Sequence, residues 1–405
     1  MPLDRVRWGR LAVAVWAGVI LALSGLAAVW PRAHSVYPIF ANAGHNWLAG
    51  ADLYGPQAGR LDHYRYSPLA ATLFVPFSLM PERLGNVLWR LVGVGVYLVG
   101  LAWWVRTVLP RRLRGAERGV FWLLVVPLSL GSLHNGQSNV LLLGLLLAAG
   151  AAVATGRWWL ASACVSGACL FKVYAVALGL LLGVVYPRRF AGRWAVALAV
   201  GVALPFLCQR PGYVGGQSAR WVSSLWMDDD RQGWPVAQTY RDFRLLCRVW
   251  LVPLSTQAYL AVQVLAGAAM AAVCLVFRRA GWPQQRLLTM LLALACCWMT
   301  AFGPATESCT YTLLAPALAW SILETWADPR RPWARVVRLI SYGLCVLAQT
   351  ALWLPGGTEV GKLGLQPLAA LLLLGSVVGA EVHRMIEDRH QRGRRALVLP
   401  PAGAA

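Results

Sequence analysis

The chain has 405 residues, of which 58% are hydrophobic and 13% are charged. Soluble proteins carry about 25% charged residues, so this chain cannot cover a folded globule with polar surface, and lipid must solvate most of it. The net charge of +21 does not indicate a nucleic-acid partner, because most arginines fall in short clusters between apolar segments, as signals of membrane orientation do.

The N-terminal segment has the charge pattern of a first transmembrane helix. Basic residues at positions 5–10 precede about twenty apolar residues, which are enough to cross a bilayer. A secretory signal peptide would end at small residues, whereas residues 30–32 are Trp-Pro-Arg. We therefore predict that the segment 11–30 is a retained helix.

A long connection from Pro31 to Tyr66 follows and is rich in polar and aromatic residues. Gly50 predicts the end of a short interfacial helix over Ala41–Ala49. Asp52 and Asp62 are candidates for a general base, which needs a carboxylate at the watery edge of a cavity. The alternatives are that Asp52 is a turn residue and that Asp62 caps a helix.

Apolar segments along the rest of the chain predict an all-α, polytopic membrane bundle of about twelve transmembrane helices, with interfacial helices in the first outer loop. The stretch Ser67–Pro81 is too short to cross and is expected to dip in or lie at the interface. The predicted helices are residues 11–30, 85–106, 119–132, 139–155, 158–170, 174–186, 190–207, 250–277, 286–303, 308–325, 336–354 and 365–385.

Basic clusters in the connections alternate from one side of this bundle to the other. The positive-inside rule assigns the arginine-rich side, with both termini, to the cytoplasm. Residues 1–386 are predicted to form one integral membrane domain, and residues 387–405 a basic cytoplasmic tail that is disordered. The clusters are Arg5/Arg7/Arg10, Arg111/Arg112/Arg114/Arg118, Arg157, Arg188/Arg189/Arg193, Arg278/Arg279, Arg330/Arg331/Arg335 and Arg389/Arg392/Arg394/Arg395.

Lys172 interrupts the apolar stretch from Trp158 to Tyr186 and is one of only two lysines, the other being Lys362. A lone ammonium in such a stretch is costly and marks a ligand or charge pathway. The alternative is a lysine that snorkels to the surface, but Lys172 falls at the mid-point of a predicted helix pair. We expect it to contact a phosphate.

Two further polar interruptions accompany this lysine. His134, Asn135 and Gln137 precede a helix that begins at Asn139, and the free amides of a helix start suit hydroxyl or phosphate ligands. Glu307 can act as a base or bind sugar hydroxyls, or it can merely cap the next helix. The predicted alternation brings all three interruptions to the outer side, where they would form one polar chamber.

A second long outer connection runs from Cys208 to about Val249 and carries basic residues on the side where orientation rules disfavour them. Either its charges pair with one another in a solvated loop, or Arg220 and Arg241 bind an anionic headgroup such as a lipid phosphate. Cys208 and Cys247 flank this connection at similar depth, so a disulfide between them is an open alternative.

Four motifs in order resemble those of glycosyltransferase family 87, the bacterial polyprenyl-phosphate-dependent mannosyltransferases with the GT-C fold. The resemblance covers roughly residues 11–330. Each motif alone has little specificity, and their order and spacing carry the resemblance. The matching residues are Tyr37 with Ala43-Gly44 and Gly50-Ala51-Asp52-Leu53-Tyr54; Tyr66-Ser67-Pro68 with Val75-Pro76; Gly136-Gln137-Ser138-Asn139; and Lys172.

The resemblance implies an enzyme of the bacterial plasma membrane that moves a hexose, typically mannose, from a polyprenyl phosphate to a glycan or glycolipid acceptor on the extracytoplasmic face. Such enzymes usually invert the anomeric carbon and need one base, cations around the phosphate and no cofactor beyond the donor; no metal-ligand set stands out. We assign substrate contacts to Lys172, His134, Asn135, Gln137, Asn139, Tyr37, Tyr54, Arg65, Arg220, Arg241 and Tyr311.

Two positions depart from the family pattern. Family members commonly carry an aspartate just before the first-loop tyrosine, whereas residues 33–37 contain no carboxylate. The late motif usually has Ser-Trp and then His, whereas residues 307–311 are Glu-Ser-Cys-Thr-Tyr. Either the base has moved to Glu307, Asp52 or Asp62, or the protein is an inactive scaffold. A transporter or flippase for a polyprenyl-linked or anionic substrate is the competing interpretation.

Overall fold

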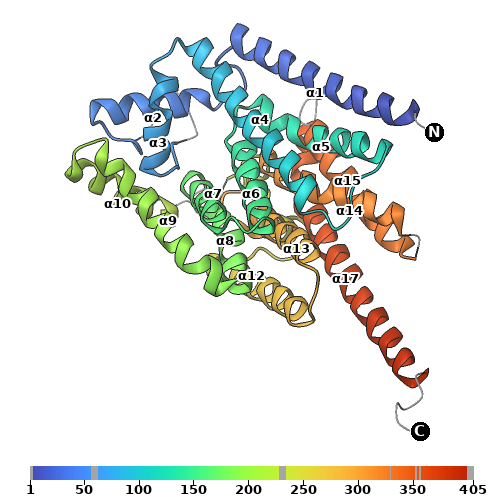
Figure 1. Cartoon of the computed structure of the whole chain (residues 1–405). Coiled ribbons are helices and arrows are strands. Elements are labelled where there is room, and N and C mark those ends of the chain that lie inside the picture. The colour runs from blue at the N-terminus through green and yellow to red at the C-terminus, as the bar shows by residue number, and fades with distance from the viewer. Residues whose placement is uncertain are drawn as a thin grey trace.

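The computed structural model describes residues 3–55, 63–227, 234–328, 330–351, 354 and 357–398. Every regular element in these residues is helical, which confirms the all-α prediction (Figure 1). The α-helices are α1 (Leu3–Val29), α2 (Tyr37–Ala49), α3 (Pro68–Ser78), α4 (Glu82–Thr107), α5 (Ala116–His134), α6 (Asn139–Ala154), α7 (Trp158–Phe171), α8 (Val176–Val185), α9 (Gly192–Ala203), α10 (Pro211–Met227), α11 (Phe243–Trp250), α12 (Thr256–Arg279), α13 (Gln284–Cys297), α14 (Ala315–Ala327), α15 (Pro332–Ala351), α16 (Gly357–Lys362) and α17 (Leu365–Val398). Short 3₁₀ or π turns are η1 (Val173–Ala175), η2 (Pro187–Ala191), η3 (Leu204–Leu207), η5 (Val236–Gln238), η6 (Trp298–Phe302) and η7 (Ser308–Leu314).

Each of the twelve predicted ranges overlaps a helix. Seven helical segments of the described residues are long and apolar enough to cross a membrane, and four shorter apolar helices accompany them. The chain is therefore a multi-pass membrane protein, while the count of twelve crossings stays a prediction. The seven segments are Arg7–Val29, Glu82–Thr107, Ala116–His134, Pro187–Leu207, Thr256–Arg279, Gln284–Phe302 and Leu365–Asp388.

Three predicted boundaries are wrong. The expected helix 250–277 is interrupted near its start, since α11 ends at Trp250 and α12 begins at Thr256. Pro253 cannot continue a helix, and Ser255 caps α12 by accepting a hydrogen bond from Ala258 N at 3.2 Å. α2 begins at Tyr37 rather than Ala41 and ends, as predicted, at Gly50, which has the left-handed φ of 65°. α17 continues to Val398, so the boundary drawn at residue 386 falls inside a helix.

Helix α6 lies at the centre of the bundle and packs closely against α4 (Figure 1). The contact depends on two glycines, because a Cβ on Gly100 would lie 2.3 Å from the carbonyl oxygen of Gly144. Small residues at such crossings let two helix backbones approach in a lipid-embedded bundle. α1 packs on the outside of α4 and α5, and α17 projects beyond the bundle.

The arginine-rich connections meet at one end of the bundle, as the charge alternation predicted. Arg111, before α5, donates to the carbonyl of Leu323 near the end of α14 at 3.1 Å. Gln284, at the start of α13, donates to the carbonyl of Val153 near the end of α6 at 3.3 Å. Segments predicted on one side of the membrane are therefore neighbours.

The second outer connection is helical over much of its described length, and its flanking cysteines form no disulfide. It includes α10 and α11 with the short turn η5. Cys208 is exposed and Cys247 is buried, and both are free thiols. The disulfide considered from the sequence is therefore not formed.

Replacing Gly100 by alanine tests the α4–α6 crossing. The new methyl group would overlap the α6 backbone, and we expect a loss of about 1–3 kcal/mol in stability, seen as a lower midpoint of thermal unfolding in detergent. Gly95→Ala is the matched control in the same helix, because a Cβ added at Gly95 would meet no atom within 4 Å. Equal midpoints for the two variants would contradict the close-approach argument.

Candidate active site

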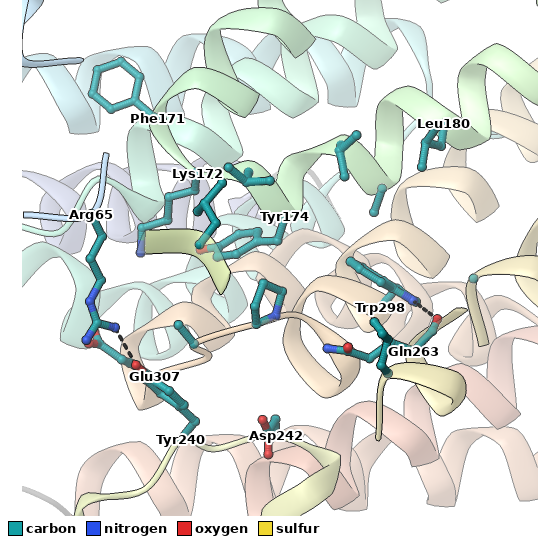
Figure 2. Close-up of a pocket in the computed structure, with 18 of the residues that line it drawn as sticks. Arg65, Phe171, Lys172, Tyr174, Leu180, Tyr240, Asp242, Gln263, Trp298 and Glu307 are labelled. Atoms are coloured by element: carbon teal, nitrogen blue, oxygen red, sulfur yellow. Dashed lines mark hydrogen bonds between the residues drawn. The ribbon is translucent and has the colours of Figure 1, made fainter. Parts of the chain in front are cut away.

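A cavity of about 1060 Å³ lies where α7 ends and where α8 and α12 begin (Figure 2). The arginine-rich connections adjoin the other ends of these helices. One part is polar and receives side chains from the first outer loop, the α7–η1 junction, the segment before η7 and the segment before α11. The other part is apolar and lies between α8 and α12. The polar lining includes His63, Arg65, Tyr66, Gln137, Lys172, Tyr174, Tyr240, Asp242, Arg244 and Glu307.

Lys172 stands where the helix breaks between α7 and η1. Its backbone is extended, with φ −141° and ψ 117°, so the side chain leaves the helix axis and enters the cavity. The ammonium lies 5.9 Å from the ring centroid of Tyr66 and 5.6 Å from that of Tyr174. No ion pair joins it to a carboxylate in the described part of the chain. Aromatic faces thus surround a cation that remains available to an anionic ligand.

The first outer loop is attached to this helix break. Ser67 Oγ donates to the carbonyl of Leu170 at 2.6 Å, and Tyr54 donates its hydroxyl to the carbonyl of Tyr66 at 2.8 Å. These bonds fix the backbone of Tyr66 beside Lys172. Tyr54, a predicted substrate contact, therefore supports the ring that faces the cavity.

Glu307 reaches the same cavity from the segment before η7 and is held by the α5–α6 turn. Its Oε2 accepts a hydrogen bond from Gln137 Nε2 at 2.9 Å and one from Cys309 Sγ at 3.5 Å. Its backbone N–H donates to Thr310 Oγ1 at 3.2 Å, so it also begins η7 as the capping alternative required. Glu307 therefore both caps η7 and lines the cavity.

The rest of the α5–α6 turn lies behind the cavity wall. Asn139 is fully buried and accepts a hydrogen bond from the Tyr174 hydroxyl at 3.0 Å. His134 packs against His34 with ring centroids 5.5 Å apart, and Asn135 accepts from Val36 N at 2.9 Å. Of the four predicted residues of this turn, Gln137 alone is among the residues that line the cavity.

The second outer connection contributes residues that the sequence did not single out. Tyr240 accepts a hydrogen bond from Arg65 at 2.5 Å, and both line the cavity. Arg241 is turned away from it: its backbone N–H donates to the carbonyl of Thr306 at 2.6 Å, and its carbonyl accepts from the buried Tyr311 hydroxyl at 2.7 Å. Arg241 and Tyr311 thus hold this connection against the segment that bears Glu307.

Asp52, Arg220 and Tyr37, three other predicted residues, do not line the cavity. Asp52 pairs with Arg220 at 2.5 Å, and its Oδ1 accepts from Tyr54 N at 3.2 Å, as in the turn alternative. Tyr37 is buried and donates to the carbonyl of Phe77 at 2.9 Å. Asp62 lies outside the described residues. Among the predicted base candidates, the structure places Glu307 in the cavity.

The apolar part of the cavity is a groove between α8 and α12. The turn η6 holds α12 in place. Trp298 donates to the carbonyl of Gln263 at 2.9 Å (Figure 2), and the Gln263 side chain donates to the carbonyl of Phe302 at 2.5 Å. Small side chains keep the groove open on the α12 side. The groove is lined by Val176, Ala177, Leu180, Leu181 and Val184 of α8 and by Leu260, Val264, Gly267, Ala268, Met270 and Ala271 of α12.

Residues 64–304, more than half of the chain, match the family model described as Glycosyltransferase family 87. The chain is 28% identical over 348 residues to a polyprenol-phosphate-mannose-dependent alpha-(1-2)-phosphatidylinositol pentamannoside mannosyltransferase of Mycolicibacterium smegmatis, covering 77% of this chain and 75% of that protein. Two crystal structures of ArnT from Cupriavidus metallidurans also match. The apo structure has a TM-score of 0.41 and 16% identity, covering 93% of this chain and 78% of ArnT. The structure bound to undecaprenyl phosphate has a TM-score of 0.38 and 14% identity, covering 96% and 81%.

Asp242 gives this site a pH-dependent stability. Burial raises the pKa of its carboxyl from 3.8 to about 6, although the α11 N–H of Leu245 donates to it and opposes the shift. A carboxyl whose pKa is raised in the folded state contributes stability below pH 3.8, and this contribution is lost as the pH rises through about 6.

We expect Asp242→Asn to flatten this dependence by up to about 3 kcal/mol, because asparagine caps a helix without titrating. The measurement is the thermal unfolding midpoint in detergent between pH 4.5 and 7.5, compared with the unchanged chain. Parallel pH profiles for the two proteins would show that Asp242 is not the titrating group.

Proposed function

Because the chain belongs to glycosyltransferase family 87, we propose that it transfers a hexose, mannose, from a polyprenyl phosphate to an acceptor hydroxyl on the extracytoplasmic face of the membrane. Family membership makes it a membrane glycosyltransferase. Polyprenol phosphate mannose is the donor named for the mycobacterial relative. We assign the same class of donor to this chain because the cavity has a polar part for a sugar phosphate and an apolar part for a prenyl chain. The acceptor is a glycan or glycolipid.

The observation that carries the proposal is a cation at the junction of a polar chamber and an apolar groove. Lys172 lies at this junction, where a lipid phosphate would place its charge. The apolar groove between α8 and α12 then receives the polyprenyl chain, which lipid-facing helices can admit from the side. Arg65 lies in the same polar part and can bind the phosphate or the sugar beside it.

In the proposed reaction, the acceptor hydroxyl attacks the anomeric carbon from the face opposite the phosphate. Glu307 accepts the hydroxyl proton as general base, held in place by Gln137. The new bond joins the acceptor oxygen to the anomeric carbon, while the bond from that carbon to the phosphate oxygen breaks and inverts the centre. Lys172 stabilises the phosphate that leaves with its lipid. The reaction as written uses the donor and the acceptor and needs no further cofactor.

The proposed orientation places the cavity outside the cytoplasm. Arginine clusters gather at the opposite end of the bundle, and short connections rich in arginine remain cytoplasmic in bacterial membranes. Both termini are then cytoplasmic, and the lipid-linked donor is used in the outer leaflet.

Lys172→Ala tests phosphate binding. Loss of one charged donor from a preorganised site costs about 10²–10³-fold in turnover, and we expect a decrease of that order in transfer from radiolabelled mannosyl polyprenyl phosphate. Lys362→Ala is the matched control, because Lys362 is the other lysine and pairs with the exposed Glu359. Full activity in Lys172→Ala, with the control also active, would remove Lys172 from the mechanism.

Glu307→Gln tests the base and separates it from the carboxylates of the first outer loop. Glutamine keeps the shape and the bond to Gln137 but accepts no proton, so we expect turnover to fall by about 10²–10⁴-fold with donor binding retained. Asp52→Asn is expected to change turnover little, because Asp52 pairs with Arg220 outside the cavity. Asp62→Asn completes the comparison. An active Glu307→Gln variant beside an inactive Asp62→Asn variant would move the base to the first outer loop.

A further inference from the structure

The other end of the α8–α12 pair carries a cationic cluster that sugar transfer does not use. Arg189 of η2 lies over the ring of Trp158 at 5.8 Å, and Arg278 at the end of α12 lies over the ring of Tyr186 at 5.5 Å. The two rings are themselves in contact, with centroids 5.3 Å apart. Two guanidinium groups thus flank one aromatic pair that joins the end of α8 to the start of α7.

Carboxylates are missing from this region. The sequence contains no aspartate or glutamate between residues 118 and 227 or between residues 243 and 306, and these stretches include α6 to α9 and α12 to α13. In the described part of the chain, Arg189 and Arg278 form no ion pair and both are exposed. Their guanidinium groups are therefore not neutralised by a carboxylate of the described residues.

The positive-inside rule requires basic residues at this end of the bundle but does not require them to stack on aromatic rings, as Arg189 and Arg278 do. A guanidinium stacked on a ring still presents its N–H groups along its edge, and this edge binds phosphate bidentately. Tryptophan and tyrosine at helix ends mark the depth of the lipid headgroups. Trp159 extends the platform, because Arg193 lies 5.7 Å from its ring and donates to the carbonyl of Arg189 at 2.6 Å.

We infer that Arg189 and Arg278, on the Trp158–Tyr186 platform, bind the phosphate headgroup of an anionic phospholipid in the leaflet at the arginine-rich end. Clusters of basic residues at the cytoplasmic ends of transmembrane helices attract such headgroups. The bound phosphate bridges η2, which follows α8, to the end of α12. These two helices also form the walls of the apolar groove, so the lipid fastens the groove at the end remote from Lys172.

The experiment is native mass spectrometry of the full chain in neutral detergent, titrated with phosphatidylglycerol and, separately, with phosphatidylcholine. A direct hydrogen bond from a guanidinium to a phosphate contributes about tenfold in affinity, so Arg189→Gln and Arg278→Gln each weaken phosphatidylglycerol binding by about tenfold and the double variant by about 100-fold. Binding of phosphatidylcholine stays unchanged.

The matched control is Arg188→Gln with Arg279→Gln. It removes the same charge from the same two connections, but among the described residues no aromatic ring lies against either of these exposed arginines. Retained phosphatidylglycerol binding in the control, with loss in the Arg189/Arg278 variant, supports the site. Equal loss in both overturns the site in favour of diffuse surface charge, and loss in neither overturns it because the lipid then binds elsewhere. Thermal unfolding without added lipid verifies that each variant is folded, and the two single variants decide the result if the double variant does not purify. The readout is independent of sugar transfer.

Discussion

The active-site geometry depends on a requirement of lipid-embedded chains: polar groups that a helix break exposes inside the bundle must find partners in the protein. The helix is interrupted at the α5–α6 turn, at Lys172 and before η7, and these three segments lie side by side. Their polar side chains form hydrogen bonds with one another. Gln137 bonds Glu307, and Tyr174 bonds Asn139. Lys172 is the exception, because aromatic rings surround its ammonium and no carboxylate forms an ion pair with it in the described residues. In the proposed reaction, the phosphate of the donor pairs with this ammonium.

The same requirement explains how much of the site the sequence could predict. Long apolar segments and the alternation of arginine clusters were sufficient to locate twelve helices and to place Lys172, Gln137 and Glu307 at the same end. Each of these residues interrupts an apolar run, and such an interruption is visible in one sequence without any relative. The α11–α12 boundary was missed because Pro253 lies in a segment that is otherwise apolar.

The residues of the outer connections could not be placed from local patterns. Tyr240 enters the cavity because Arg241 pairs its backbone with that of Thr306, a contact between segments far apart in the chain. Conversely, Asp52 matches a family motif but forms an ion pair with Arg220 beyond the cavity. The motif residues Tyr37 and Tyr54 donate hydrogen bonds to backbone carbonyls and so stabilise the first outer loop. Their match to a family motif therefore did not show whether they contact the substrate or stabilise the loop.

The helices α8 and α12 line the apolar groove that continues from the polar part of the cavity. Their facing side chains form the groove, and α12 is tied to η6 by Gln263 near the active site. At the other end, Arg278 and Tyr186 bring the end of α12 onto the end of α8. In the proposed reaction, a groove held at both ends would receive a flexible prenyl chain without moving Lys172 or Glu307. The phosphate can then bind at a site whose polar groups are already in place, which is the arrangement that electrostatic stabilisation of a leaving phosphate requires.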